Sequence, residues 1–81
     1  TPNPFTNNTI INFVLPEAAK VNFSLYDILG NQITIINNVY YNKGLNHITI
    51  RPDELDMVPG IYFYKFVYKG QLYSGKIIFV K

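Results

Sequence analysis

Apolar and polar residues alternate along most of the chain. The clearest stretch is VNFSLY at 21–26, where Val21, Phe23 and Leu25 occupy every second position and more polar residues lie between them. A period of two places one side of a β-strand on the core and the other in water. The same pattern recurs at 8–16, 32–36, 47–50, 61–68 and 72–81, and each of these segments is predicted to be a strand.

Turn-forming residues separate the predicted strands. Gly30 and Asn31 tolerate positive φ and favour a reversal after the second strand, and Lys43-Gly44 marks another turn. The stretch 37–46 is expected to be the loosest of the chain. RPDELDMVPG at 51–60 is a connecting corner, because Pro52 and Pro59 cannot donate ladder hydrogen bonds. No apolar period of 3.6 residues extends beyond a turn or two, so the prediction is an all-β fold, an immunoglobulin-like antiparallel β-sandwich of about seven strands.

The alternation also predicts which side chains form the core. The expected core residues are Phe13, Val21, Phe23, Leu25, Ile33, Ile48, Tyr62, Phe66 and Ile77. Tyr62 follows Pro59 at the end of the corner, a position from which the tyrosine of an immunoglobulin-like sandwich bonds back to the preceding backbone. The sequence leaves that role and plain core packing as equal alternatives.

Composition narrows the class of protein. The 81 residues form one domain, and 48% hydrophobic against 15% charged residues excludes a disordered tail. Cysteine is absent, so neither a disulfide framework nor a thiolate metal site can form. Apolar runs of four or five residues are far too short for a membrane span, so the domain is not expected to be membrane-embedded. Because the chain begins at Thr1 without a signal peptide, we interpret it as part of a longer protein.

The two parts of the chain differ in charge. Residues 1–56 hold three cations against five acids, a net charge of −2, whereas residues 57–81 hold four lysines and no acid. Those lysines are Lys65, Lys69, Lys76 and Lys81. The basic end could favour an acidic partner, or it could be only a solvated face. Nucleic acid is not expected as a partner, because no arginine cluster and no recognised binding motif is present.

The sequence offers little chemistry for catalysis. The single histidine, His47, has the opposite parity to Ile48 and Ile50 and is expected to face solvent. Asp53, Glu54 and Asp56 form the only acidic cluster, but the spacing of a calcium loop is missing. The seven tyrosines could form a sugar-binding platform, although their alternation with Phe and Ile favours packing. We therefore expect no enzyme activity, no catalytic residue, no cofactor and no metal site.

Several short motifs follow one another along the whole chain in a recognisable order. The chain opens with PNPF at 2–5 and a strand ending in LPEA at 15–18, followed by VNFSLYDILGNQI at 21–33. GLNHITI at 44–50, MVPGIYFYKF at 57–66 and the final GKIIFVK at 75–81 complete the set. In this order and spacing the chain resembles the type A C-terminal sorting domain of the type IX (Por) secretion system of Bacteroidetes. Met57, where Leu is usual, and Ile50, where an aromatic residue is common, depart from the family pattern.

The resemblance implies a function and a set of partners. Such a domain folds in the periplasm and is the signal that the outer-membrane translocon recognises. A sortase-like signal peptidase typically removes it just ahead of its first strand. The covalently attached N-terminal cargo protein is then secreted or anchored at the cell surface on an anionic lipopolysaccharide. By this resemblance residues 1–81 are a single C-terminal sorting domain of a larger secreted protein.

The resemblance also assigns residues. The final strand is the candidate for recognition by the translocon and comprises Gly75, Lys76, Ile77, Ile78, Phe79, Val80 and Lys81. The family-motif residues with structural roles are Pro2, Asn3, Pro4, Gly30, Gly60 and Tyr62. The alternative is an immunoglobulin-like accessory module of a secreted enzyme, which binds carbohydrate or protein or serves as a spacer. Position distinguishes the two, since a sorting signal must end its protein.

Overall fold

Six β-strands account for most of the residues that the structure describes. This structure is a computed structural model, and it describes residues 7–80. The strands are β1 (Thr9–Leu15), β2 (Ala19–Asp27), β3 (Gln32–Tyr41), β4 (Gly44–Ile50), β5 (Gly60–Tyr68) and β6 (Gln71–Phe79). Within this part of the chain no helix has the length and apolar character needed to cross a membrane.

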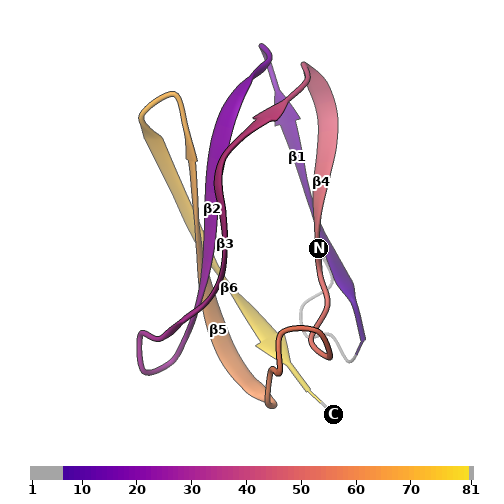
Figure 1. The fold of residues 1–81 in the computed structure, drawn as a ribbon, viewed down its shortest axis with the longest axis vertical. Coiled ribbons are helices and arrows are strands. Elements are labelled where there is room, and N and C mark those ends of the chain that lie inside the picture. Colours follow the sequence, from indigo (N-terminus) through magenta and orange to yellow (C-terminus); the bar gives the residue numbers. More distant parts are fainter. Residues whose placement is uncertain (1–6, 81) are drawn as a thin grey trace.

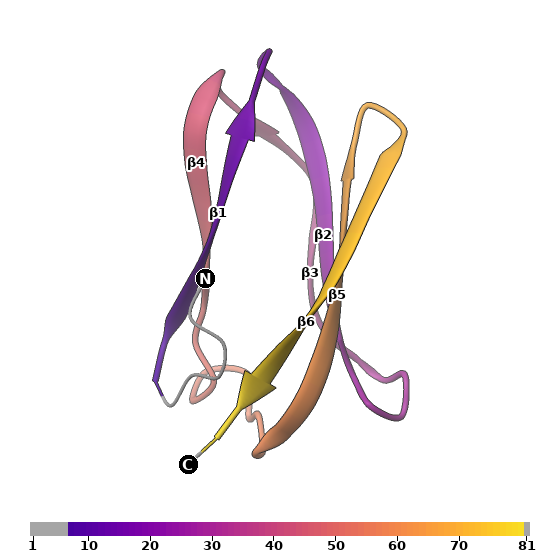
Figure 2. The same cartoon turned by 180° about the vertical axis from the view of Figure 1, so that it is seen from behind.

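The strands form two antiparallel sheets that face each other. One sheet has the order β1-β4 and the other has the order β3-β2-β5-β6. Figure 1 shows β1 and β4 as one layer and the other four strands as the second, and Figure 2 shows the same two layers from behind. The chain passes between the layers after β1, after β3 and after β4. The expected all-β, immunoglobulin-like antiparallel sandwich is confirmed.

The core lies between the two layers and is filled by the side chains that the alternation selects. Buried hydrophobic residues are Ile11, Leu15, Val21, Phe23, Leu25, Ile48, Ile50, Tyr62, Phe66, Ile77 and Phe79. Seven of the nine predicted core residues are among them, whereas Phe13 and Ile33 are half-buried and pack against the cluster. Phe13 still joins the layers, because its ring centroid on β1 lies 4.8 Å from that of Phe66 on β5.

The strand β3 corrects one expectation. Residues 37–41 continue the strand, and the stretch predicted to be loosest is therefore largely regular. The pairing with β2 is irregular here, since Val21 pairs with Val39 but Phe23 pairs with Ile36. Asn38 has a φ of 58°, and its backbone N–H donates to Asn22 Oδ1 at 2.7 Å. A β-bulge of this kind keeps an asparagine-rich segment inside the sheet and distorts an edge strand that could otherwise pair with another chain.

Candidate recognition site

The final strand β6 is an edge strand of the four-stranded sheet. It pairs only with β5 in the described part of the chain, in a register that sets Gly60 opposite Phe79 and Tyr62 opposite Ile77. Ile77 and Phe79 are buried, while Lys76 is exposed and Ile78 and Val80 are half-buried. The strand therefore contributes to the core with one side and presents the other outward. Lys81, Pro2, Asn3 and Pro4 lie outside the described residues.

Gly75 is required by the packing of β5 against β6. It lies directly opposite Tyr64, whose ring covers the glycine: a Cβ at Gly75 would lie 2.5 Å from Tyr64 Cζ. The Tyr64 ring in turn stacks on Phe23, with 5.9 Å between the ring centroids. Because Gly75 has no side chain, the Tyr64 ring can pack against the final strand at this position.

Tyr62 adopts the corner role. Its hydroxyl donates to the Val58 carbonyl oxygen at 2.5 Å and accepts from the Val58 backbone N–H at 3.0 Å. The ring is buried, so the one side chain fills the core and satisfies both backbone groups of Val58. This geometry decides between the two alternatives that the sequence left open. The tyrosine fixes the 51–59 corner against the start of β5.

Gly30 lies in the turn between β2 and β3, which Asp27 organises. Gly30 has a φ of 86°, and its N–H donates to the Asp27 carbonyl at 3.0 Å. The Asp27 Oδ1 atom accepts the backbone N–H groups of Leu29 and Asn31, each at 2.9 Å. These bonds, that from the Asn31 backbone above all, lower the pKa of Asp27 below its ordinary value of 3.8. Sequence reasoning missed Asp27, although an aspartate three residues before a glycine in a turn is a signal for such capping.

The structure brings several motif residues to one end of the sandwich. Asp27 at the end of β2 pairs with Tyr62, and Gly60 two residues earlier pairs with Phe79 at the end of β6. The β2–β3 turn, the corner and the end of β6 therefore share an end, which is the lower end in Figure 1. Residues as far apart in the sequence as Asp27 and Phe79 thus lie at the same end of the sandwich.

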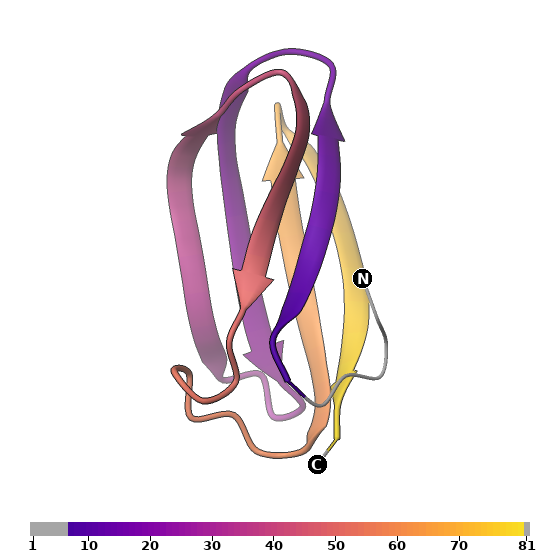
Figure 3. The ribbon, with the colours of Figure 1, turned by 90° about the vertical axis from the view of Figure 1, so that its right-hand side faces the viewer.

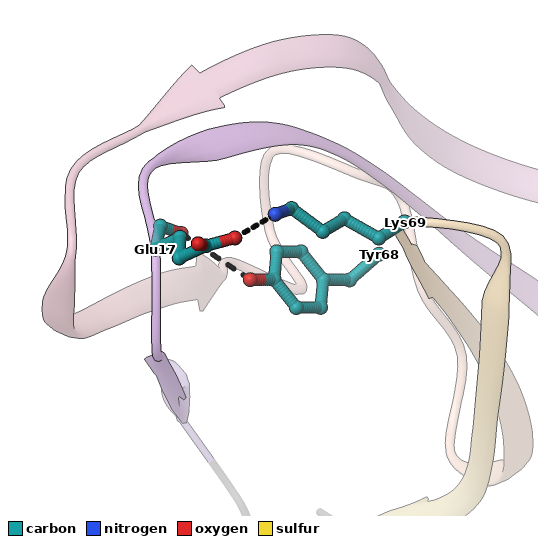
Figure 4. A network of polar contacts seen from close by, with 3 residues as sticks. All are labelled: Glu17, Tyr68 and Lys69. Atoms are coloured by element: carbon teal, nitrogen blue, oxygen red, sulfur yellow. Dashed lines mark hydrogen bonds and ion pairs between the residues drawn. The ribbon is translucent and has the colours of Figure 1, made fainter.

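A polar latch joins the two layers at the opposite end. Figure 4 shows the Lys69 ammonium donating to the Glu17 carboxylate and the Tyr68 hydroxyl donating to the Glu17 carbonyl oxygen at 3.4 Å. Glu17 lies between β1 and β2, and Lys69 lies in the hairpin turn between β5 and β6. The hydrogen bond from Lys69 lowers the pKa of Glu17, and the same bond raises the pKa of Lys69. Lys69, one of the four lysines of the basic end, is therefore paired with a carboxylate of the same domain.

An apolar groove lies between β1 and the four-stranded sheet. It has a volume of ≈ 370 Å³ and is lined largely by aromatic rings, among them Phe13, Tyr64, Tyr68 and Tyr73. Figure 3 shows the sandwich from the side of β1 and β4, with β5 and β6 behind them. Tyr73 is 52% exposed, but Tyr64 and Tyr68 are half-buried and pack against the core. The groove thus lacks the several exposed rings that a sugar platform would need.

The residues considered for catalysis and metal binding lie in two elements, with His47 on β4 and the acidic cluster in the β4–β5 corner. His47 is exposed on β4, as its parity predicts. Glu54 pairs with Arg51 at 3.4 Å in the corner. Among residues 7–80 the structure gathers no group of three or more His, Cys, Asp or Glu that could hold a metal ion. The absence of catalysis, cofactor and metal remains an expectation.

Comparison with known proteins identifies the class of domain. The model of one family, described as "Secretion system C-terminal sorting domain", matches residues 2–81. No curated protein and no solved structure matches the chain significantly. The family match covers nearly the whole sequence and includes every strand of the sandwich. The chain therefore belongs to the family of secretion system C-terminal sorting domains, which carry the sorting signal of the type IX secretion system for export across the outer membrane to the cell surface or beyond.

Proposed function

We propose that residues 1–81 form the single C-terminal sorting domain of a larger exported protein and that the type IX outer-membrane translocon recognises its final strand. The observation that carries this proposal is the family match over residues 2–81. A domain of this family implies an N-terminal cargo protein and the type IX machinery as partners. The domain is in this role the signal and not a catalyst.

The position of β6 supports its role in recognition. The strand is at an edge of the four-stranded sheet, and its outward side carries Lys76. Its inward side carries Ile77 and Phe79, each of which stabilises the fold by roughly 1.5–3 kcal/mol through burial. Deletion of residues 75–81 would therefore unfold the domain and could not test recognition. Substitution of the lysines alone separates recognition from folding.

The test uses a periplasmic reporter fused to the domain, in a bacterium with a type IX system. The parent fusion should leave the cell, and the Lys76→Glu/Lys81→Glu variant should accumulate in the periplasm while it melts like the parent. Exposed substitutions change stability by no more than about 0.5 kcal/mol in general. A Lys43→Glu variant reverses the charge of an exposed lysine outside the final strand and should be exported. Normal export of the folded Lys76/Lys81 variant would overturn the role of these charges.

We further propose that a sortase-like peptidase removes the domain from its cargo, which is then released or joined to an anionic lipopolysaccharide. The support for this step is the family to which the chain belongs. Mass spectrometry of the exported reporter tests it directly. A reporter that lacks the domain is the expected product, either free in the medium or bound to the cell surface. An exported reporter that still carries the intact domain would contradict removal.

A further inference from the structure

The outer face of the four-stranded sheet is basic and partly apolar. Because side chains alternate, this face is formed by the residues between the core positions of β2, β5 and β6. It comprises Lys20, Asn22, Ser24 and Tyr26 on β2, Ile61, Phe63, Lys65 and Val67 on β5, and Leu72, Ser74, Lys76 and Ile78 on β6. The term outer face refers below to these twelve residues.

The outer face contains three lysines and no acid. All five acidic residues of the chain lie elsewhere, in the β1–β2, β2–β3 and β4–β5 connections or at their edges. Glu17 is already engaged by Lys69, and the Asp27 carboxylate is engaged by its own turn. The outer face therefore carries three lysines and no acidic side chain of its own. A surface with side-chain charges of one sign favours a partner of the opposite sign.

An exposed aromatic side chain lies among these charges. Phe63 pairs directly with Lys76 on β6 and with Tyr26 on β2. Phe63 is 43% exposed and Ile61 on the same face is 36% exposed, so apolar surface remains open to solvent. Lys65 is two residues further along β5, and its ammonium lies 5.3 Å from the centroid of the Tyr26 ring. The outer face thus places an exposed aromatic side chain opposite Lys76 and two residues from Lys65.

Lys65 and Lys76 lie near each other in the strand register. Lys65 pairs with Ser74 and Lys76 pairs with Phe63, so the two lysines are diagonal neighbours on adjacent strands. Diagonal neighbours on an antiparallel pair are separated by about 7–8 Å. One partner segment can therefore meet both positions.

We propose that the outer face is a second recognition surface, which docks onto a protein of the export machinery that offers carboxylates around an apolar contact. The inference rests on the proposed function and extends the recognised region from the final strand to the central strand β5. Aromatic side chains at the centre of an interface supply contact area, and charges around them steer and orient the partner. Three lysines are fewer than the four to eight cations typical of lipid-binding clusters, which favours a protein over a membrane surface.

The test uses substitutions on β5, so that every residue of the final strand stays unchanged. Lys65→Glu and Phe63→Ser are made in the exported reporter fusion. We expect each to lower export about tenfold, as the loss of a charge pair or an apolar contact at an interface does. Lys65→Arg keeps the charge and should be exported like the parent. Thermal melting of the purified domains should show that all of these variants are folded.

Matched controls lie away from the outer face. Lys43→Glu makes the same change in charge in the β3–β4 turn, and Leu45→Ser removes an apolar side chain that is 75% exposed on β4. Both should leave export unchanged. If the controls lowered export as much as Lys65→Glu and Phe63→Ser do, the effect would be general to the surface, and the proposal would be wrong.

The outcomes separate this inference from the proposed function. If the parent fusion is not exported, the proposed function fails, and the inference fails with it. If the parent is exported and folded Lys65→Glu and Phe63→Ser are exported equally well, only the inference fails. Vesicles of phosphatidylglycerol and phosphatidylcholine provide the remaining arm. Sedimentation of the parent domain with these vesicles, lost in Lys65→Glu, would assign the face to a lipid headgroup and overturn the protein partner.

Discussion

The ring of Tyr64 on β5 lies over Gly75, its direct partner on β6, in the space that a side chain at position 75 would occupy. A glycine in a strand interior ordinarily costs about 0.5–1 kcal/mol relative to alanine, because it loses more backbone entropy on folding. Here the absence of a Cβ lets Tyr64 stack on Phe23 and close the core beneath the final strand. The packing of the Tyr64 ring therefore requires glycine at position 75, where the proposed recognition segment begins.

Gly75→Ala should destabilise the domain by about 1–3 kcal/mol, because the added methyl group displaces the Tyr64 ring. Urea denaturation of Gly75→Ala, Tyr64→Ala and the double variant measures the coupling between the two positions. In the Tyr64→Ala background the same Gly75→Ala change should stabilise by about 0.5–1 kcal/mol, since only the entropic advantage of alanine remains. Additive effects of the two substitutions would contradict the packing described here.

Tyr62→Phe should lower the free energy of unfolding by about 0.5–1.5 kcal/mol, because both backbone groups of Val58 lose the same hydroxyl partner. Equilibrium unfolding in urea at neutral pH provides the measurement. Tyr73→Phe removes a hydroxyl from an exposed ring and is the matched control, with an expected change within about 0.5 kcal/mol. Equal values for the two variants would mean that the corner does not depend on the hydroxyl.

Phe23→Ala should destabilise by about 3–5 kcal/mol, the range for truncating a buried phenylalanine. Phe23 is 1% exposed, at the centre of the cluster between the two layers. Total stabilities of small domains are only about 5–15 kcal/mol, so the variant should be marginally folded at room temperature. A denaturant midpoint close to that of the parent would show that the position is not in the core.

The Asp27 carboxylate should make stability depend on pH in the acid range. Its pKa in the folded domain is lowered below 3.8, so the unfolded chain takes up the proton first as the pH falls. The stabilisation is therefore fully present above pH 3.8 and is lost as the pH falls through the folded pKa. The difference in stability between the parent and Asp27→Asn should be largest near neutral pH and should shrink below pH 3.8.

This measurement needs a background without Glu17, whose pKa is also lowered in the folded domain. Glu17→Gln removes that second titration from both chains being compared. Asp53→Asn serves as the control for the loss of one carboxylate, since it leaves the β2–β3 turn intact. If the difference in stability that Asp27→Asn makes in this background did not change with pH, the turn would not depend on the carboxylate charge.

The period of two by itself determined the fold class and most of the core. Val21, Phe23 and Leu25 are buried because alternate side chains of a strand share one face, and this requires no knowledge of the partner strands. The exposed His47 and the outward Lys76 follow from the same rule. The succession of short motifs likewise predicted the family, although no single motif is specific.

Tertiary structure decided what depends on contacts between distant segments. The continuation of β3 through Asn38 depends on the Asn22 side chain of the neighbouring strand, and local propensity favoured a loop there. The need for Gly75 and the diagonal of Lys65 and Lys76 follow from strand register. The role of Tyr62 follows from the fold of the corner, which brings Val58 to its hydroxyl. Register is set by how whole strands pair and pack, so it is not contained in the alternation of any one strand.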